Sequence, residues 1–280
     1  MRAHSPSIAE TKGTRSKMQD AGEIKTWYGA TDGYTMGVFD GHGNHGALVA
    51  QWAAIELVIP RELGSTIPPE DLARHIGEKT RELHNTLRTR TFEIGKHAGA
   101  TATVACTDGR SIAVSHSGDS AALWVADDRA QEPTVLTPIH DLSNRQERER
   151  IMKGGYEIVQ RTSQNGRLIE RARGEGGDSQ MVTRCIGDAD MGFVDPSDEV
   201  HVFTPRSPGT LALMTDGVYA NFPGGLLNPG GLSVGNLIRT VATGRQVPPQ
   251  ELAAYIVGKL ENPENAMLAT VRIDNSVGWA

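Results

Sequence analysis

Four aspartates follow apolar segments of the chain and could supply the oxygen ligands of a metal centre. They are Asp40 after 34–39, Asp119 after 111–117, Asp216 at the end of 211–216, and Asp274 after 269–273. Hard divalent cations prefer oxygen ligands, and Mg²⁺ takes only a few carboxylates because it keeps several waters. Carboxylates from distant strand ends can meet at one rigid edge, as a site for two cations about 4 Å apart requires. The sequence therefore predicts a divalent-metal centre, provided that Asp40, Asp216 and Asp274 share one pocket.

Aspartate is followed by glycine four times, at 32–33, 40–41, 108–109 and 216–217. Such pairs are most often turns, because glycine accepts a positive φ. The pair 108–109 lies between two predicted strands and indicates a two-residue hairpin, and the pair 32–33 also fits a turn. Asp40-Gly41 differs, because His42-Gly43 and a predicted helix follow it in place of a return strand.

Short apolar or alternating runs predict the strands that would carry these residues. They cover 34–39, 100–106, 111–117, 121–126, 155–160, 210–215 and 269–273. Helices are predicted over 46 to about 63, 68–90, 143–153, 232–243 and 249–260. In the first helix, Leu48, Trp52, Ile55 and Ile59 recur every three or four residues and would form its buried face.

The limits of the helix 143–153 and the order of the predicted elements can both be read from the sequence. Ser143 and Gln146 match a capping box, and Gly154-Gly155 would end that helix. Strands that follow one another, with helices set apart from them, favour an α+β fold over a doubly wound parallel sheet.

Composition excludes several classes of protein. With 28 Lys and Arg against 34 Asp and Glu, the net charge of the 280-residue chain is −6, which disfavours a nucleic-acid binder. No signal peptide and no apolar run of transmembrane length is visible, and two cysteines are too few for a disulfide framework. We therefore expect a cytoplasmic protein that contacts neither nucleic acid nor membrane.

Several short motifs together resemble one family. Val38-Phe39-Asp40-Gly41-His42-Gly43 is similar to the Asp-Gly-His-Gly signature of the metal-dependent protein phosphatases of type 2C. Each of the other motifs is short, but they occur in the order of that family over most of the chain. They are 13–15, 18–21, 99–102, 118–120, 149–155, 182–188, 215–217 and 274–275.

The resemblance implies a four-layer α-β-β-α sandwich, in which two antiparallel sheets lie between helix pairs. We expect one phosphatase domain over 1–280, with 1–10 as a loose N-terminal extension. Two Mn²⁺ or Mg²⁺ ions would bind, with Asp40 bridging both and the Gly41 carbonyl contacting one. Asp216 and Asp274 would hold the other ion, and Asp20 and Gln19 would lie in or just outside the coordination shell.

The same resemblance implies the reaction and its participants. A hydroxide held by the two cations would attack the phosphorus of phosphoserine or phosphothreonine in a protein substrate. Arg15 would neutralise the phosphoryl oxygens, and His42 would protonate the leaving alkoxide. A serine/threonine kinase is then a plausible partner, and we expect a monomer that acts in signalling.

Departures from the family pattern leave alternatives open. Gln19 stands where many members carry glutamate, and Ala220 replaces an aspartate that helps to hold a third ion beside Asp119, so the third ion is uncertain. A catalytically weak member that binds phosphoproteins as a regulatory module is the alternative function. A two-metal nuclease is disfavoured by the acidic charge. The segment 171–180 is either a lengthened surface loop or a flap that selects substrates.

Overall fold

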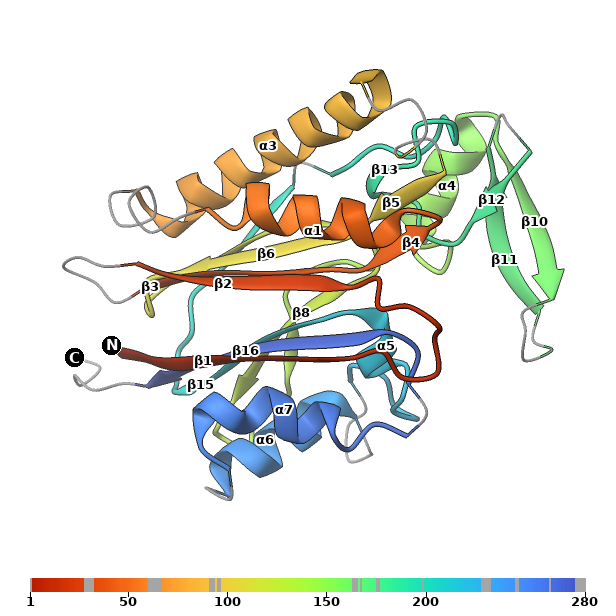
Figure 1. The fold of residues 1–280 in the computed structure, drawn as a ribbon. Coiled ribbons are helices and arrows are strands. Elements are labelled where there is room, and N and C mark those ends of the chain that lie inside the picture. The colour runs from red at the N-terminus through yellow and green to blue at the C-terminus, as the bar shows by residue number, and fades with distance from the viewer. Residues whose placement is uncertain are drawn as a thin grey trace.

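Two antiparallel sheets stacked face to face form the centre of the molecule, and helices cover both outer faces (Figure 1). The computed structural model describes residues 2–27, 33–59, 67–90, 94, 97–162, 166, 168–174, 177–197, 199–227, 233–244, 247–261 and 263–274. This layered arrangement confirms the α+β class and the order helix, sheet, sheet, helix.

The first sheet has five strands in the order β14-β7-β6-β3-β2. Their bounds are Ala21–Trp27 for β2, Gly33–Phe39 for β3, Ala102–Thr107 for β6, Ile112–Ser117 for β7 and Val200–Phe203 for β14. Helices α1 (Gly46–Leu57) and α3 (Pro69–Arg90) pack on its outer face through an apolar cluster that includes Leu57 and Ile76.

The second sheet has five strands in the order β1-β16-β15-β8-β9. Their bounds are Arg2–Thr11 for β1, Ala121–Ala126 for β8, Thr134–Val135 for β9, Gly209–Met214 for β15 and Ala266–Asp274 for β16. Helices α6 (Val234–Thr243) and α7 (Leu252–Val257), with the 3₁₀ turn Pro249–Glu251, cover its outer face, and α5 (Asp216–Tyr219) follows β15.

The expectation of a loose N-terminal extension is wrong for residues 2–10. Strand β1 pairs with β16 from Arg2 to Thr11. The buried Ser7 hydroxyl accepts a hydrogen bond from the Ala253 amide at 3.3 Å, which ties the strand to α7. These backbone and side-chain bonds make the segment the edge strand of the sheet.

The interface between the two sheets is apolar. Met36 and Val38 from β3 are fully buried against Leu211 and Leu213 from β15 and their neighbours. Because successive strand residues point to opposite faces, the other face of each sheet packs on its helices. This closed core fixes the two sheets relative to each other.

Two small sheets lie at one end of the sandwich. One joins β4 (Gly41–Gly43), β5 (Ala98–Ala100) and β13 (Ile186–Gly187). The other, here called the side sheet, joins β10 (Glu157–Thr162), β11 (Leu168–Arg173) and β12 (Ser179–Gln180), and stands beside the sandwich with α4 (Arg145–Lys153) (Figure 1).

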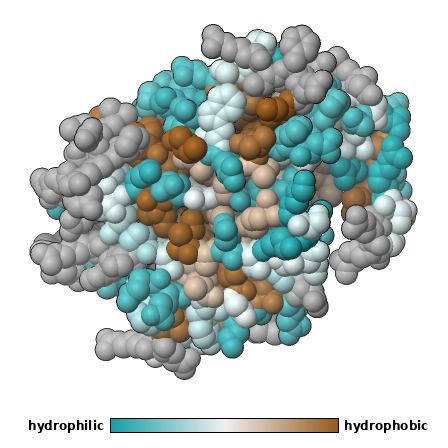
Figure 2. Space-filling view, viewed as in Figure 1, coloured by the Kyte–Doolittle hydropathy of each residue, from teal (hydrophilic) through white to brown (hydrophobic). Residues whose placement is uncertain are grey.

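The buried face of α1 differs from the prediction. Leu48 and Ile55 have relative exposures of 52% and 72%, whereas Val49, Ala53 and Leu57 are buried. The helix is apolar nearly all round, so the spacing of large residues does not identify the side that packs. Small alanines let the helix lie close to the sheet, and Leu48 and Ile55 remain outside, where Figure 2 shows hydrophobic atoms at the surface over α1.

The turn after β6 is longer than predicted. Thr107 pairs with Ile112, so four residues form the loop, and Asp108 Oδ1 accepts hydrogen bonds from the Arg110 and Ser111 amides at 2.8 Å each. The Asp-Gly pair at 32–33 starts at a position outside the described residues.

The cap of α4 also differs from the prediction. Asn144 is the N-cap in place of Ser143, since its Oδ1 accepts a bond from the Gln146 amide at 3.0 Å. The expected glycine stop is present, with Gly155 at φ +81°. No helix in the described part of the chain has the length and apolar character needed to cross a membrane.

Candidate metal centre

Four of the predicted aspartates lie at the same end of the two sheets. Asp40 follows β3, Asp20 precedes β2, Asp119 lies in the turn from β7 to β8, and Asp216 begins α5 just after β15. Strands β3 and β7 are both antiparallel to β6 and so end at the same edge. Strand β15 is antiparallel to β8, which starts beside Asp119, so β15 ends there too. Strand direction therefore gathers these carboxylates from both sheets.

Hydroxyl groups hold the backbone and side chains of this centre. Asp20 Oδ2 accepts a hydrogen bond from Thr215 Oγ1 at 2.9 Å, across the gap between the sheets. The Asp40 amide donates to Thr101 Oγ1 at 2.9 Å, and that hydroxyl is 2.7 Å from Ser120 Oγ. These bonds hold the Asp20 carboxylate and the backbone of Asp40 in place.

Burial and mutual repulsion disfavour the charged forms of the four carboxyl groups. Burial raises the pKa of Asp20 from 3.8 to about 7 and that of Asp119 to about 8, and the charge of Asp216 adds to both increases. Burial and the charges of Asp216 and Asp20 raise the pKa of Asp40 well above its usual range. One oxygen each of Asp20 and Asp119 is buried without a hydrogen-bond partner among the described residues.

These features fit divalent cations. Buried carboxylates that cannot all remain charged alone become stable when a bound ion supplies the opposite charge. Oxygen-only donors are the ligands that Mg²⁺ and Mn²⁺ prefer. Asp20, Asp40, Asp119 and Asp216 are therefore the candidate ligands.

The prediction for Asp274 is wrong. Strand β16 is antiparallel to β15, with Leu268 opposite Met214 and Ile273 opposite Gly209, so Asp274 lies at the far end from Asp216. At about 3.3 Å per residue, its Cα is roughly 25 Å along the strand from Ala266 beside the centre. There it accepts a hydrogen bond from Arg272 Nε at 2.7 Å. The centre rests on Asp40, Asp216 and Asp20 in place of the expected triad.

Glu264, which the sequence analysis missed, lies at the near end of β16. Its side chain is exposed and hydrogen-bonded to Arg15, and its charge contributes, after burial, to the raised pKa of Asp216. The next residue, Asn265, spans the Lys17 carbonyl and the Gln19 amide at 3.0 Å each in its hydrogen-bonding orientation. The sequence signal for Glu264 is an acidic residue shortly before the predicted strand 269–273, whereas the strand-end pattern points to acidic residues that follow strands.

Glycine is required at two positions of the centre by close backbone approach. A Cβ at Gly41 would lie 2.4 Å from the carbonyl oxygens of Gln19 and Gly46, and one at Gly217 would lie 1.8 Å from that of Asn265. The side-chain Nε2 of Gln19 donates to the Gly43 carbonyl at 2.8 Å, so it supports this backbone.

His42 and Arg15 flank the carboxylates. His42 Nε2 lies 2.5 Å from Asp188 Oδ2, and Gln180 Nε2 from the side sheet lies 2.6 Å from the same ring nitrogen. Burial opposes protonation of His42, but the charge and hydrogen bond of Asp188 outweigh it and raise the pKa above 6.5. Half of the Arg15 side chain is exposed, and its charge opposes the rise in the pKa of Asp216.

The segment 171–180 connects the side sheet to this site, with residues 175 and 176 outside the description. Arg171 Nε donates to the Ser179 carbonyl at 2.8 Å, and Gln180 carries the contact to His42. Gln180 and Asp188 lie within the segments 171–180 and 182–188, but their residue types and spacing alone predict no role for either one.

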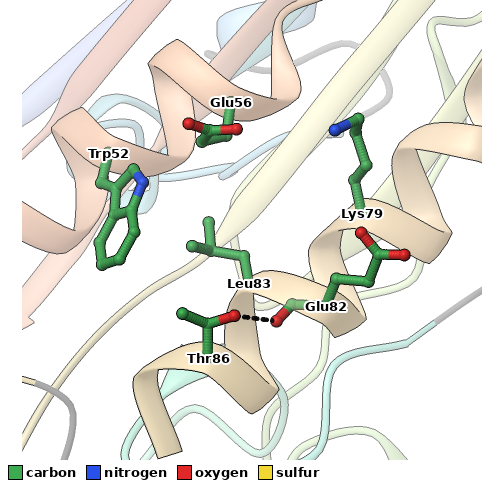
Figure 3. Close-up of a pocket in the computed structure, with 6 residues that line it drawn as sticks. All are labelled: Trp52, Glu56, Lys79, Glu82, Leu83 and Thr86. Carbon is green, nitrogen blue, oxygen red and sulfur yellow. Dashed lines mark hydrogen bonds between the residues drawn. The ribbon is translucent and has the colours of Figure 1, made fainter. Parts of the chain in front are cut away.

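A surface hollow between α1 and α3 is separate from this centre (Figure 3). Its lining consists of Trp52, Glu56, Lys79, Glu82, Leu83 and Thr86. Within it, Thr86 donates to the backbone oxygen of Glu82 at 2.9 Å, a bond internal to α3. None of the six is a candidate ligand, so the hollow adds nothing to the metal chemistry.

Comparison with known proteins gives consistent matches. A family model described as Protein phosphatase 2C matches residues 5–223. Probable protein phosphatase 2C 61 of Arabidopsis thaliana is 27% identical over 233 residues, which cover 76% of this chain and 68% of that protein.

Solved structures share the fold. Serine-threonine phosphatase 2C from Toxoplasma gondii superposes with a TM-score of 0.74 at 18% identity, covering 97% of this chain and 95% of the other. A sex determining protein of C. elegans superposes with a TM-score of 0.72 at 21% identity, covering 98% of this chain and 65% of the other.

Proposed function

Because the chain belongs to the protein phosphatase 2C family of serine/threonine protein phosphatases, we propose that it hydrolyses phosphoserine and phosphothreonine in proteins with Mn²⁺ or Mg²⁺. The observation that carries the proposal is the group of buried carboxylates, contributed by both sheets, whose pKa values are raised. We further propose that 1–280 is one phosphatase domain, since Asp20 and Asp216 come from different sheets and serve one site.

Asp40, Asp216 and Asp20 would hold two divalent cations, with the Gly41 carbonyl as a further ligand. When bound, the cations supply the Lewis acidity that makes a water a competent nucleophile near neutral pH. Ala220 occupies the position where many family members carry an aspartate that helps to hold a third ion. Asp119 would therefore hold a third ion only if other groups replace that aspartate.

The remaining steps belong to side chains beside the carboxylates. Arg15 would bind the phosphoryl oxygens with its guanidinium fork, and in doing so would exchange Glu264 for the substrate. As the phosphorus–oxygen bond to the serine or threonine breaks, His42 would donate a ring proton to the leaving oxygen. Asp188 supports that role because it orients the ring and favours its protonated form.

The substrates would then be phosphorylated proteins, which a serine/threonine kinase must supply. We also propose that the protein acts as a monomer in the cytoplasm and binds neither nucleic acid nor membrane.

Hydrolysis of p-nitrophenyl phosphate and of a phosphothreonine peptide, each with Mn²⁺, Mg²⁺ or chelator, tests the proposal. We expect turnover that needs metal and that Asp40→Asn reduces at least about 100-fold, as removal of an electrostatic catalytic group does. Asp274→Asn is the matched control and should retain turnover, because Asp274 lies at the far end of β16.

Two results would contradict the proposal. Undiminished turnover in chelator would exclude the metal mechanism. Absence of turnover with every metal, from a folded protein that still binds phosphopeptide, would favour the regulatory binding module.

A further inference from the structure

Four polar side chains from three segments meet at one point next to the carboxylate centre. His42 lies on β4, Gln180 on β12, and Cys185 and Asp188 flank β13. Cys185 Sγ is 3.7 Å from His42 Nε2 and 3.4 Å from Asp188 Oδ2, and Gln180 Nε2 is 2.7 Å from the same oxygen. An imidazole that only donates a proton to a leaving group needs an orienting carboxylate but has no use for a thiol.

The donor atoms are one nitrogen, one sulfur and one oxygen. Thiolate and imidazole ligands select soft or borderline cations such as Zn²⁺, whereas carboxylates and water suit Mg²⁺ and Mn²⁺. We propose that His42, Cys185 and Asp188 form a second cation site, for Zn²⁺ or a similar divalent transition metal, distinct from the carboxylate centre.

The spacing of the donor atoms supports this assignment. Around a tetrahedral Zn²⁺ with ordinary bond lengths, donor atoms lie about 3.4–3.6 Å apart. The sulfur–oxygen and sulfur–nitrogen distances, 3.4 and 3.7 Å, already match that geometry. Only His42 and Asp188, 2.5 Å apart, must separate, by about 1 Å. Gln180 must move aside or turn its amide oxygen inward, which would give the ion a fourth ligand.

Burial and charge also favour a cation here. Cys185 and Asp188 are 0% and 3% exposed, whereas the His42 side chain is 27% exposed, so the cluster is closed except on the histidine side. Burial, and after it the charges of Asp188 and Asp119, raise the pKa of the Cys185 thiol, but the same two negative charges would stabilise a bound cation.

The backbone is shaped to bring the three donors together. Asp188, at φ 47°, is the only described residue other than glycine with a positive φ, a conformation that side chains rarely adopt. A Cβ at Gly99 would lie 2.7 Å from both His42 Nε2 and Asp188 Oδ2. A glycine and a strained aspartate therefore create the space in which these side chains converge.

The consequence for catalysis rests on the proposed function. An ion bound to His42 Nε2 takes the place of the proton on that nitrogen, so the ring can no longer reach the doubly protonated form that would give a proton to the leaving group. Zn²⁺ should therefore inhibit the Mn²⁺-loaded enzyme, and added Mn²⁺ should not relieve the inhibition by simple competition.

Cobalt(II) absorption tests the site without any need for turnover. The full chain is titrated with Co²⁺ in excess Mg²⁺, which occupies the carboxylates, and thiolate-to-cobalt charge transfer is followed in the near ultraviolet. We expect a band that saturates at one Co²⁺ per chain and disappears when Zn²⁺ is added. Cys185→Ser should abolish the band and weaken Zn²⁺ binding at least about 100-fold. The control is Cys106→Ser, which removes the other buried cysteine and should leave the band intact.

Three outcomes overturn the proposal: no band from the folded wild-type protein, a band that survives in Cys185→Ser, or a band lost in Cys106→Ser. If Cys185→Ser does not fold by circular dichroism, Asp188→Asn takes its place and must weaken Zn²⁺ binding by a similar factor. A protein without phosphatase activity that still gives the band refutes the proposed function and leaves this site standing.

Discussion

The carboxylate centre should destabilise the metal-free protein, and Asp20→Asn should relieve that effect. Burial and the neighbouring Asp216 raise the pKa of Asp20 from 3.8 to about 7, which corresponds to at most about 4 kcal/mol of stability lost on ionisation. An asparagine keeps an oxygen for Thr215 Oγ1 and places an amide where Asp20 Oδ1 has no partner. We therefore expect Asp20→Asn to raise the free energy of unfolding in chelator at pH 7.5 by a few kcal/mol.

The pH dependence follows from the direction of this change. A carboxyl group whose pKa is higher in the folded state contributes stability below its unfolded pKa, and that contribution is lost as the pH rises through the folded pKa. The metal-free wild-type protein should therefore lose stability between about pH 4 and pH 7, and Asp20→Asn should lose less.

Urea unfolding followed by tryptophan fluorescence, in chelator at pH 5 and pH 7.5, measures both effects. Asp274→Asn is the control, because that carboxylate is paired with Arg272 far from the centre and should not change the difference between the two pH values. Addition of Mn²⁺ at pH 7.5 should stabilise the wild-type protein more than Asp20→Asn. An Asp20→Asn protein that is less stable than wild type in chelator at pH 7.5, with an unchanged pH difference, would refute the reasoning.

Three further predictions concern the scaffold. Glu147→Gln should lower the free energy of unfolding by about 3 kcal/mol, because it leaves Arg184 without its charged partner. Although burial opposes it, hydrogen bonds lower the pKa of Glu147 to about 2, so this stabilisation should disappear as the pH falls from about 4 to about 2. Acid titration of the stability of both proteins measures the effect. Ile55→Lys should change the urea midpoint little, whereas Leu57→Lys should prevent folding, since only Leu57 faces the core; equal effects would contradict the observed face of α1. Gly217→Ala should lower the free energy of unfolding by more than about 2 kcal/mol, because the added Cβ would overlap the Asn265 carbonyl. It should also weaken Mn²⁺ binding measured by calorimetry. A variant of normal stability would show that the backbone shifts to make room for the Cβ.

Predictions from the sequence succeeded where local chemistry decides the outcome. Asp40 comes directly after the buried strand β3, and Asp216 follows the buried strand β15 after one intervening residue, so their local sequence already placed them at a strand end. Asp274 also follows apolar residues, but β16 runs antiparallel to β15, and a sequence segment does not reveal its direction in the sheet. The pairing partners of the strands, which local residues do not determine, decide which of these aspartates lie at the centre.

The same reason explains the other differences. Strand β2 is half-buried along most of its length and lacks the apolar run by which buried strands are predicted. Helix α1 is apolar all round, so only packing against the sheet selects Val49 and Leu57 over Leu48 and Ile55. The role of Asp188 depends on a contact with His42, a residue 146 positions away in the sequence.

The hydrogen bond from Thr215 to Asp20 links a residue of one sheet to a residue of the other. Cations bound between Asp20, Asp40 and Asp216 would link the two sheets across the interface between them. A shift of one sheet along the other would then move the ligands apart and weaken metal binding, even when every ligand is intact. Substitution of deeply buried side chains such as Met36 or Leu213 would thus change metal binding, because it would change the alignment of the two sheets.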